Sequence, residues 1–122
     1  MKIILASKSG VRKKILDEHK VASKVISSNL DEDEIKISLE AEGADPTVIS
    51  KNLAEIKSIK VSSRNPDQLV LGADSVVAFN NKVINKPKSR EEAFEILKKL
   101  NNAKHHLISS VCISKNGAMI WN

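Results

Sequence analysis

The sequence has few aromatic residues and a single cysteine. Phe79, Phe94 and Trp121 are its three aromatic residues, so the core must be aliphatic and little is present to stack the bases of single-stranded nucleic acid. Cys112 has no partner within the chain, which argues against a disulfide framework and indicates a buried structural thiol. Long apolar runs are also absent, since the N-terminal run IILA is too short for a membrane span or a signal peptide. We therefore expect a cytoplasmic protein that does not associate with membranes.

The net charge of +5 at first suggests a protein that binds polyanions. The basic residues are nearly all lysines spread along the chain, however, and such scatter is more typical of a solvated surface than of a nucleic-acid-binding stripe. We therefore expect no nucleic-acid partner, and a basic nucleic-acid-binding module is the less favoured alternative. A small anionic ligand that carries phosphate is compatible with this charge.

Strands and helices are expected to alternate along the 122 residues, which favours a single α/β domain with a mixed sheet. Asp45-Pro46 is a clear helix start, with Asp as N-cap and Pro at the first helical position. Ser89 begins a later helix with a capping box. The buried face of that later helix is expected to consist of Ala93, Ile96, Leu97 and Leu100.

The stretch from Leu69 to Pro87 carries the most informative pattern in the chain. Its first apolar run, LVLGA, is typical of a strand buried on both faces. Asp74 follows directly, and a second apolar run, SVVAF, leads to an Asn80-Asn81 turn and a short return strand. A carboxylate between two apolar strand segments is costly to bury unless a cation or a metal meets it. Asp74 is therefore a candidate site residue.

The loop that follows the first expected strand, Lys2 to Ser7, is a candidate anion-binding site. Ser7-Lys8-Ser9-Gly10 precedes a helix whose first turn is basic, although acids are usually preferred there because of the helix dipole. Hydroxyls, backbone N–H groups and a helix N-terminus together suit a phosphate. The loop is not a Walker loop, since no GxxxxGK[ST] is present, and a capped helix with solvent-facing lysines explains the same residues about as well.

Two further charged features each allow two interpretations. Four acids lie within the six residues from Asn29 to Glu34, which indicates either a solvated helix start or the carboxylates of a magnesium-type site. Lys57 lies beside the apolar stripe of the helix that starts at Asp45-Pro46. Its ammonium group either reaches out to water or meets an anion at the edge of that stripe.

Six motifs, in order along the whole chain, resemble the family of Maf-type nucleoside triphosphate pyrophosphatases. LASKSGVRKKIL resembles the family's opening LASxSPRRxxLL, and LDEDE resembles its acidic segment. NLAEIKS resembles LAxxKA, GADSVV resembles the GADTVV signature, and NKPKSREEAFEILKKL resembles the KP-containing start of a helix. HHLISSVCISKNGAMIW resembles the hairpin after that helix. Each motif alone is modest, but six in sequence are specific.

The resemblance implies hydrolysis of non-standard or modified nucleoside triphosphates between the α- and β-phosphates, with a divalent metal, Mg²⁺ or Mn²⁺. It implies an α/β fold of the Maf/ITPase-like kind, with a mixed twisted sheet and flanking helices, and a possible homodimer. The implied site residues are Asp74 as catalytic base and metal ligand, Glu32 as metal ligand, and Ser7, Ser9, Arg12, Lys57 and Lys86 on the phosphates.

Two departures from the family pattern modify these expectations. Gly10-Val11 replaces the family's Pro-Arg pair, which removes one cation from the phosphate loop. The second departure is length, because family members continue beyond the last hairpin into a second lobe. Residues 1–122 are therefore expected to form one Maf-like domain that lacks its C-terminal lobe. The alternative to an active enzyme is a non-catalytic remnant that binds nucleotide or phosphate.

Overall fold

The computed structural model describes residues 2–7, 10–84, 87–101 and 104–122. Within these ranges the strands form one mixed sheet in the order β2-β1-β3-β5-β6, and β4 pairs with β3 off this path. The predicted α/β fold, with a mixed sheet and flanking helices, is thus confirmed. The elements in chain order are β1 (Ile3–Leu5), α1 (Gly10–Glu18), β2 (Ser23–Val25), α2 (Glu32–Ala41), α3 (Pro46–Arg64), β3 (Val70–Phe79), β4 (Lys82–Ile84), α4 (Arg90–Leu100), β5 (His106–Lys115) and β6 (Ala118–Trp121).

The parallel and antiparallel parts of the sheet meet at β3. β1 runs parallel to both β2 and β3, whereas β5 runs antiparallel to β3 along most of its length. β1 pairs with β3 only at Val70 and Leu71, and β4 pairs with it from Val77 onward. Between these partners, the edge of β3 from Gly72 to Val76 has no strand beside it in the described part of the chain. This gap lies at the carboxyl end of β1, where open α/β sheets commonly bind ligands.

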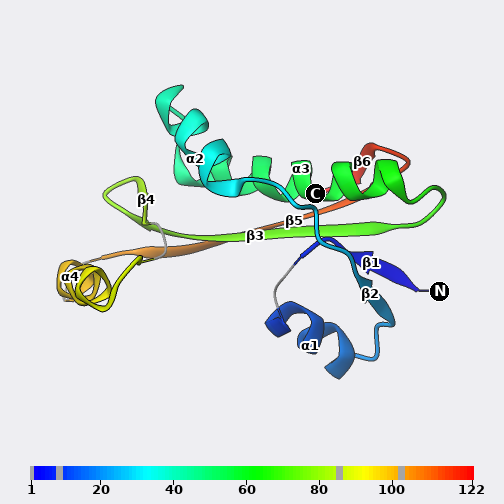
Figure 1. Cartoon of the computed structure of the whole chain (residues 1–122), viewed down its shortest axis with the longest axis horizontal. Helices are drawn as coiled ribbons and strands as arrows, with labels where there is room; N and C mark the ends of the chain where they lie inside the picture. The colour runs from blue at the N-terminus through cyan, green and yellow to red at the C-terminus, as the bar shows by residue number, and fades with distance from the viewer. Residues whose placement is uncertain (1, 8–9, 85–86, 102–103) are drawn as a thin grey trace.

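The long helix α3 covers one face of β3 and β5 (Figure 1). It begins where the sequence predicts, with the Asp45 carboxylate accepting a hydrogen bond from the Val48 N–H at 2.9 Å and Pro46 in the first turn. Ile49 and Leu53 on this helix are almost fully buried against the sheet. The core is aliphatic, as the scarcity of aromatic residues requires.

The cap of α3 leads to a first testable prediction. Asp45→Ala removes the acceptor for the Val48 N–H and is expected to lower the free energy of unfolding by about 1 kcal/mol. Ser89→Ala is the matched control, because Ser89 caps α4 in the same way, accepting from the Glu92 N–H at 3.1 Å, but α4 has no buried residue. Urea denaturation should therefore show the larger loss at Asp45, and equal losses would contradict this account.

The apolar side of α4 is not buried, so the expectation for this helix is wrong. None of Ala93, Ile96, Leu97 and Leu100 is buried, and Phe94 and Leu97 are 60% and 66% exposed. Figure 1 shows α4 at the end of the molecule, away from α3. An amphipathic sequence pattern shows that a helix has an apolar face, but that face is buried only if another element packs against it.

No helix within the described ranges combines the length and apolar character that crossing a membrane requires.

The predictions for the Asn80-Asn81 turn and for the cysteine are confirmed. Asn80 and Asn81 adopt positive φ angles of 51° and 60° and link β3 to β4, as a tight turn requires. Asn116 and Gly117 link β5 to β6 in the same way, with φ angles of 53° and 80°. Cys112 is a free thiol and 2% exposed.

Candidate functional site

A pocket of about 600 Å³ lies at the gap beside β3. It is formed where the end of β1, the first turn of α1, the loop after β2, the start of α2, the middle of α3 and β3 meet. Its volume is within the range of small-molecule sites. The lining residues are Ala6, Ser7, Arg12, Ser27, Ser28, Asn29, Leu30, Asp31, Glu32, Asp33, Lys36, Lys57, Asp74 and Ser75.

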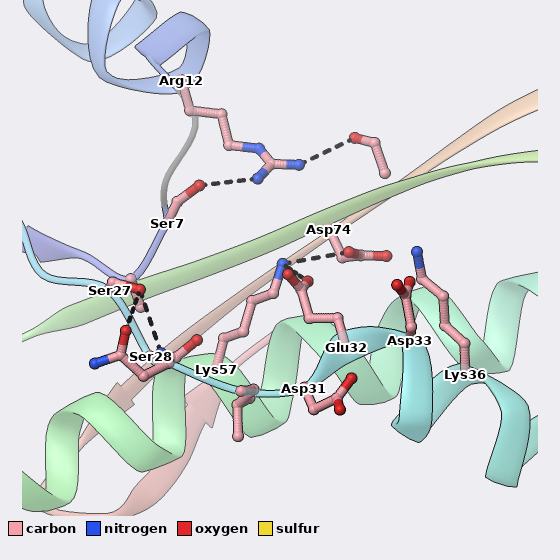
Figure 2. A pocket seen from close by; sticks show the side chains of 14 residues that line it. Ser7, Arg12, Ser27, Ser28, Asp31, Glu32, Asp33, Lys36, Lys57 and Asp74 are labelled. Carbon is pink, nitrogen blue, oxygen red and sulfur yellow. Dashed lines mark hydrogen bonds and ion pairs between the residues drawn. The ribbon is translucent and has the colours of Figure 1, made fainter. Parts of the chain in front are cut away.

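Lys57 lies at the centre of the charged cluster in this pocket. Its side chain is only 8% exposed, and its Nζ lies 2.6 Å from Glu32 Oε1 and 3.3 Å from Asp74 Oδ1. The same ammonium donates to the main-chain carbonyl of Ala73 at 3.2 Å. Figure 2 shows the three charged side chains converging from α3, α2 and β3. Of the two interpretations of Lys57, the structure shows the one in which the ammonium meets anions.

The start of α2 brings Glu32 to Lys57. Asp31 is the N-cap of this helix, because its carboxylate accepts from the Glu34 N–H at 3.1 Å. The next residue, Glu32, then forms the ion pair with Lys57. The acidic run is therefore a helix start and also contributes a carboxylate to the pocket, so the two interpretations of this run are compatible.

Both the main chain and the side chain of Asp74 accept hydrogen bonds. Its carbonyl accepts from the Ser50 hydroxyl at 3.2 Å, and Oδ1 accepts from Lys57. The residue is 5% exposed, and Oδ2 has no hydrogen-bond partner within the described ranges. Burial raises the pKa of the Asp74 carboxyl above its ordinary value of 3.8, and the Lys57 ammonium offsets only part of this rise.

The raised pKa of Asp74 predicts how stability depends on pH. The folded state binds the Asp74 proton more readily than the unfolded state, so this carboxyl contributes stability below pH 3.8 that is lost as the pH rises through its folded pKa. Asp74→Asn removes the titrating group, so the variant should gain stability relative to wild type across that window. Urea denaturation from pH 4 to 8 measures the difference.

Asp33→Asn is the matched control for this prediction, because Asp33 is an exposed acid that lines the same pocket. The fold does not desolvate this exposed carboxyl, so Asp33→Asn should not reproduce the change expected at Asp74→Asn. A difference at Asp74→Asn that does not change with pH would contradict the assigned effect of burial.

Arg12 lies on the other side of β3 from Asp74 (Figure 2). Its guanidinium donates to the Ser7 hydroxyl at 3.0 Å and to the Ser75 hydroxyl at 3.4 Å. The Ser75 and Ser109 hydroxyls are 2.8 Å apart. Asp74 and Ser75 are adjacent on β3, and successive side chains of a strand point to opposite faces. Arg12, which contacts Ser75, therefore lies on the opposite side of the strand from the Asp74 carboxylate.

The structure brings together five of the seven predicted site residues, namely Ser7, Arg12, Glu32, Lys57 and Asp74. Ser9 and Lys86 lie outside the described residues. The sequence interpretation did not identify Ser28, Asn29, Lys36 and Ser75, which also line the pocket. Only Ser75 carried a usable signal, because it directly follows Asp74 on a strand.

Glu32 and Asp74 are the residues that could hold a divalent cation. Across the part of the chain that the structure describes, no group of three or more His, Cys, Asp or Glu side chains gathers as a ligand set. A magnesium-type ion nevertheless needs only one or two carboxylates when phosphate oxygens and water complete its shell. The buried Oδ2 of Asp74 accepts from no donor among the described residues, and both acids share one ammonium. These features indicate a position suited to positive charge. The residues present therefore fit such a cation.

Comparisons with known proteins identify similar sequences. A model of the Maf family, described as Maf-like protein, matches residues 2–121. The chain is 59% identical over 120 residues to a nucleoside triphosphate pyrophosphatase of Pelagibacter ubique, and the matched region covers 98% of this chain and 62% of that protein. It is 40% identical over 119 residues to a nucleoside triphosphate pyrophosphatase of a Ruegeria species, covering 98% of this chain and 60% of that protein.

A relative whose name specifies a single nucleotide also matches. A 7-methyl-GTP pyrophosphatase of Brucella abortus is 32% identical over 121 residues, covering 99% of this chain and 61% of that protein. The chain thus spans between 60% and 62% of the length of these three curated relatives.

Proposed function

This chain belongs to the Maf-like protein family, and we propose that its pocket binds a nucleoside triphosphate and hydrolyses the bond between the α- and β-phosphates. The products are the nucleoside monophosphate and pyrophosphate. Relatives named nucleoside triphosphate pyrophosphatase and 7-methyl-GTP pyrophosphatase support this reaction class. The observation that carries the proposal is the Asp74 carboxylate, which is buried, ion-paired with Lys57 and has one oxygen without a donor in the described part of the pocket.

Asp74 acts in this proposal as the general base. It accepts a proton from the water that attacks the α-phosphorus, and the bond from that phosphorus to the bridging oxygen breaks. Pyrophosphate leaves with the bonding electrons. Burial raises the pKa of Asp74 and so makes its ionised form a stronger proton acceptor, while Lys57 favours that ionised form.

The cationic side chains bind and orient the phosphates. Arg12 and Lys57 are assigned to the triphosphate oxygens, with the Ser7 hydroxyl beside Arg12. The resemblance also assigns Ser9 and Lys86 to this role. When bound at Glu32 and Asp74, Mg²⁺ or Mn²⁺ would neutralise the negative charge that develops on the phosphate oxygens.

The substrate class, compartment and assembly complete the proposal. Non-canonical or modified nucleotides are the proposed substrates, a class to which the 7-methyl-GTP of one relative's name belongs. The cytoplasm, where nucleoside triphosphates are used, is the proposed compartment. A homodimer is the proposed assembly, with neither nucleic acid nor a membrane as partner.

A turnover assay on the 122-residue chain tests this function. The panel contains canonical and modified nucleoside triphosphates with Mg²⁺ or Mn²⁺, and the readout resolves pyrophosphate from single phosphate. Release of monophosphate and pyrophosphate supports the proposal, whereas stepwise release of single phosphates contradicts it. Nucleotide binding without turnover would instead support a non-catalytic binding protein.

A further inference from the structure

The Lys57 ammonium has three partners within the protein. It donates hydrogen bonds to Ala73 O at 3.2 Å and Asp74 Oδ1 at 3.3 Å, and it forms an ion pair with Glu32 Oε1 at 2.6 Å. An ammonium group has three donors and no more. Because these partners surround the ammonium and the side chain is only 8% exposed, we expect Lys57 to give up one of them when it binds a phosphate.

The ion-pair partners of Lys57 are the two carboxylates that fit a divalent cation. We propose that the Lys57 ammonium occupies the cation position between Glu32 and Asp74 in the ligand-free chain, and that a divalent cation displaces it from there. The displaced ammonium then has donors available for the phosphates of the substrate. This inference rests on the proposed metal-dependent function and adds an exchange of cations to it.

The charges of the cluster make the exchange depend on substrate. Glu32, Asp74 and Lys57 together carry one negative charge when all three are ionised, so a divalent cation changes the sum to one positive charge. The new cation and the ammonium repel each other within a buried site, where such repulsion is strong. A bound triphosphate removes this repulsion, because it supplies negative charge and accepts from Lys57. Metal and nucleotide should therefore strengthen each other's binding, and the effect must be reciprocal.

Binding of Mn²⁺ alone to Lys57 variants tests the exchange. Lys57→Met removes the competing cation and is expected to tighten Mn²⁺ binding by about tenfold or more, as measured from the electron paramagnetic resonance signal of free Mn²⁺. Lys36→Met is the matched control. Lys36 lines the same pocket and lowers the pKa of Asp74 through its charge, but it forms no ion pair with Asp74 within the described ranges. Its replacement should change the affinity by less than about threefold.

The outcomes separate this inference from the proposed function. Equal Mn²⁺ affinity in wild type and Lys57→Met, with binding in both, overturns the exchange but leaves the metal site intact. Equal gains at Lys57 and Lys36 would show general repulsion and also overturn it. No Mn²⁺ binding by any variant, with or without nucleotide, removes the metal from the proposed function itself.

A second measurement uses the unmodified chain, in case Lys57→Met does not fold. In protein labelled with ¹⁵N-lysine, the buried and hydrogen-bonded Lys57 ammonium should give a protected ¹H–¹⁵N signal. Titration with Mg²⁺ should abolish or shift this signal, while the Lys36 signal serves as reference. A Lys57 signal that stays unchanged at saturating Mg²⁺ would overturn the inference.

Discussion

Replacing Asp74 with asparagine is expected to lower the turnover of nucleoside triphosphate by about 10²- to 10⁴-fold, the usual contribution of a general base. Asparagine has nearly the same shape but cannot accept a proton from water. Nucleotide binding should change far less, because Arg12 and Lys57, the proposed phosphate-binding cations, remain. Pyrophosphate release under saturating substrate measures the loss of kcat, and nucleotide titration measures binding separately.

Controls at the same pocket make this result specific. Asp33→Asn removes an exposed carboxylate from the pocket lining and should leave kcat within a few-fold of wild type. The activity of wild type should also rise with pH through the raised pKa of Asp74, because only the ionised carboxyl can act as the base. Full turnover by Asp74→Asn would assign the base to another group.

Gly72→Ala is expected to destabilise the fold by about 3 kcal/mol, at the upper end of the cost of overpacking a core. A Cβ at this position would meet the backbone carbonyl of Ala54 and would lie 2.8 Å from Ser58 Cβ and 2.9 Å from Ser58 N. These atoms belong mainly to the backbone of α3, so α3 and β3 must move apart at this point. Because α3 carries Lys57, the same shift should also disturb the pocket.

Gly10→Ala is the matched control for this substitution. Apart from its chain neighbours and the backbone of its own helix, no described atom lies within 4 Å of the Cβ that would be added at Gly10, and the residue begins α1. Alanine there should be neutral or slightly stabilising, because it lowers the entropy of the unfolded chain. Urea denaturation of both variants measures the contrast, and equal stabilities would contradict the close approach of α3 to β3.

Much of the local structure could be predicted from the sequence, because it depends on neighbouring residues. Asp45-Pro46 starts α3, and the Asn80-Asn81 turn follows β3, since capping and positive φ are preferences of short segments. Asp74 stood out because an acid inside an apolar strand needs a compensating partner. The family resemblance then assigned the other site residues in order along the chain, although their roles stay predictions.

The sequence by itself determined where α3 and α4 begin, where the Asn80-Asn81 turn lies, and that Asp74 must meet positive charge. Only the tertiary structure decided which group meets it. Lys57 and Asp74 are 17 residues apart, and Arg12 and Ser75 are 63 apart, so their contacts depend on sheet register and on how closely α3 packs. The exposure of α4 was likewise decided in three dimensions, because burial of an amphipathic helix needs a surface to receive it.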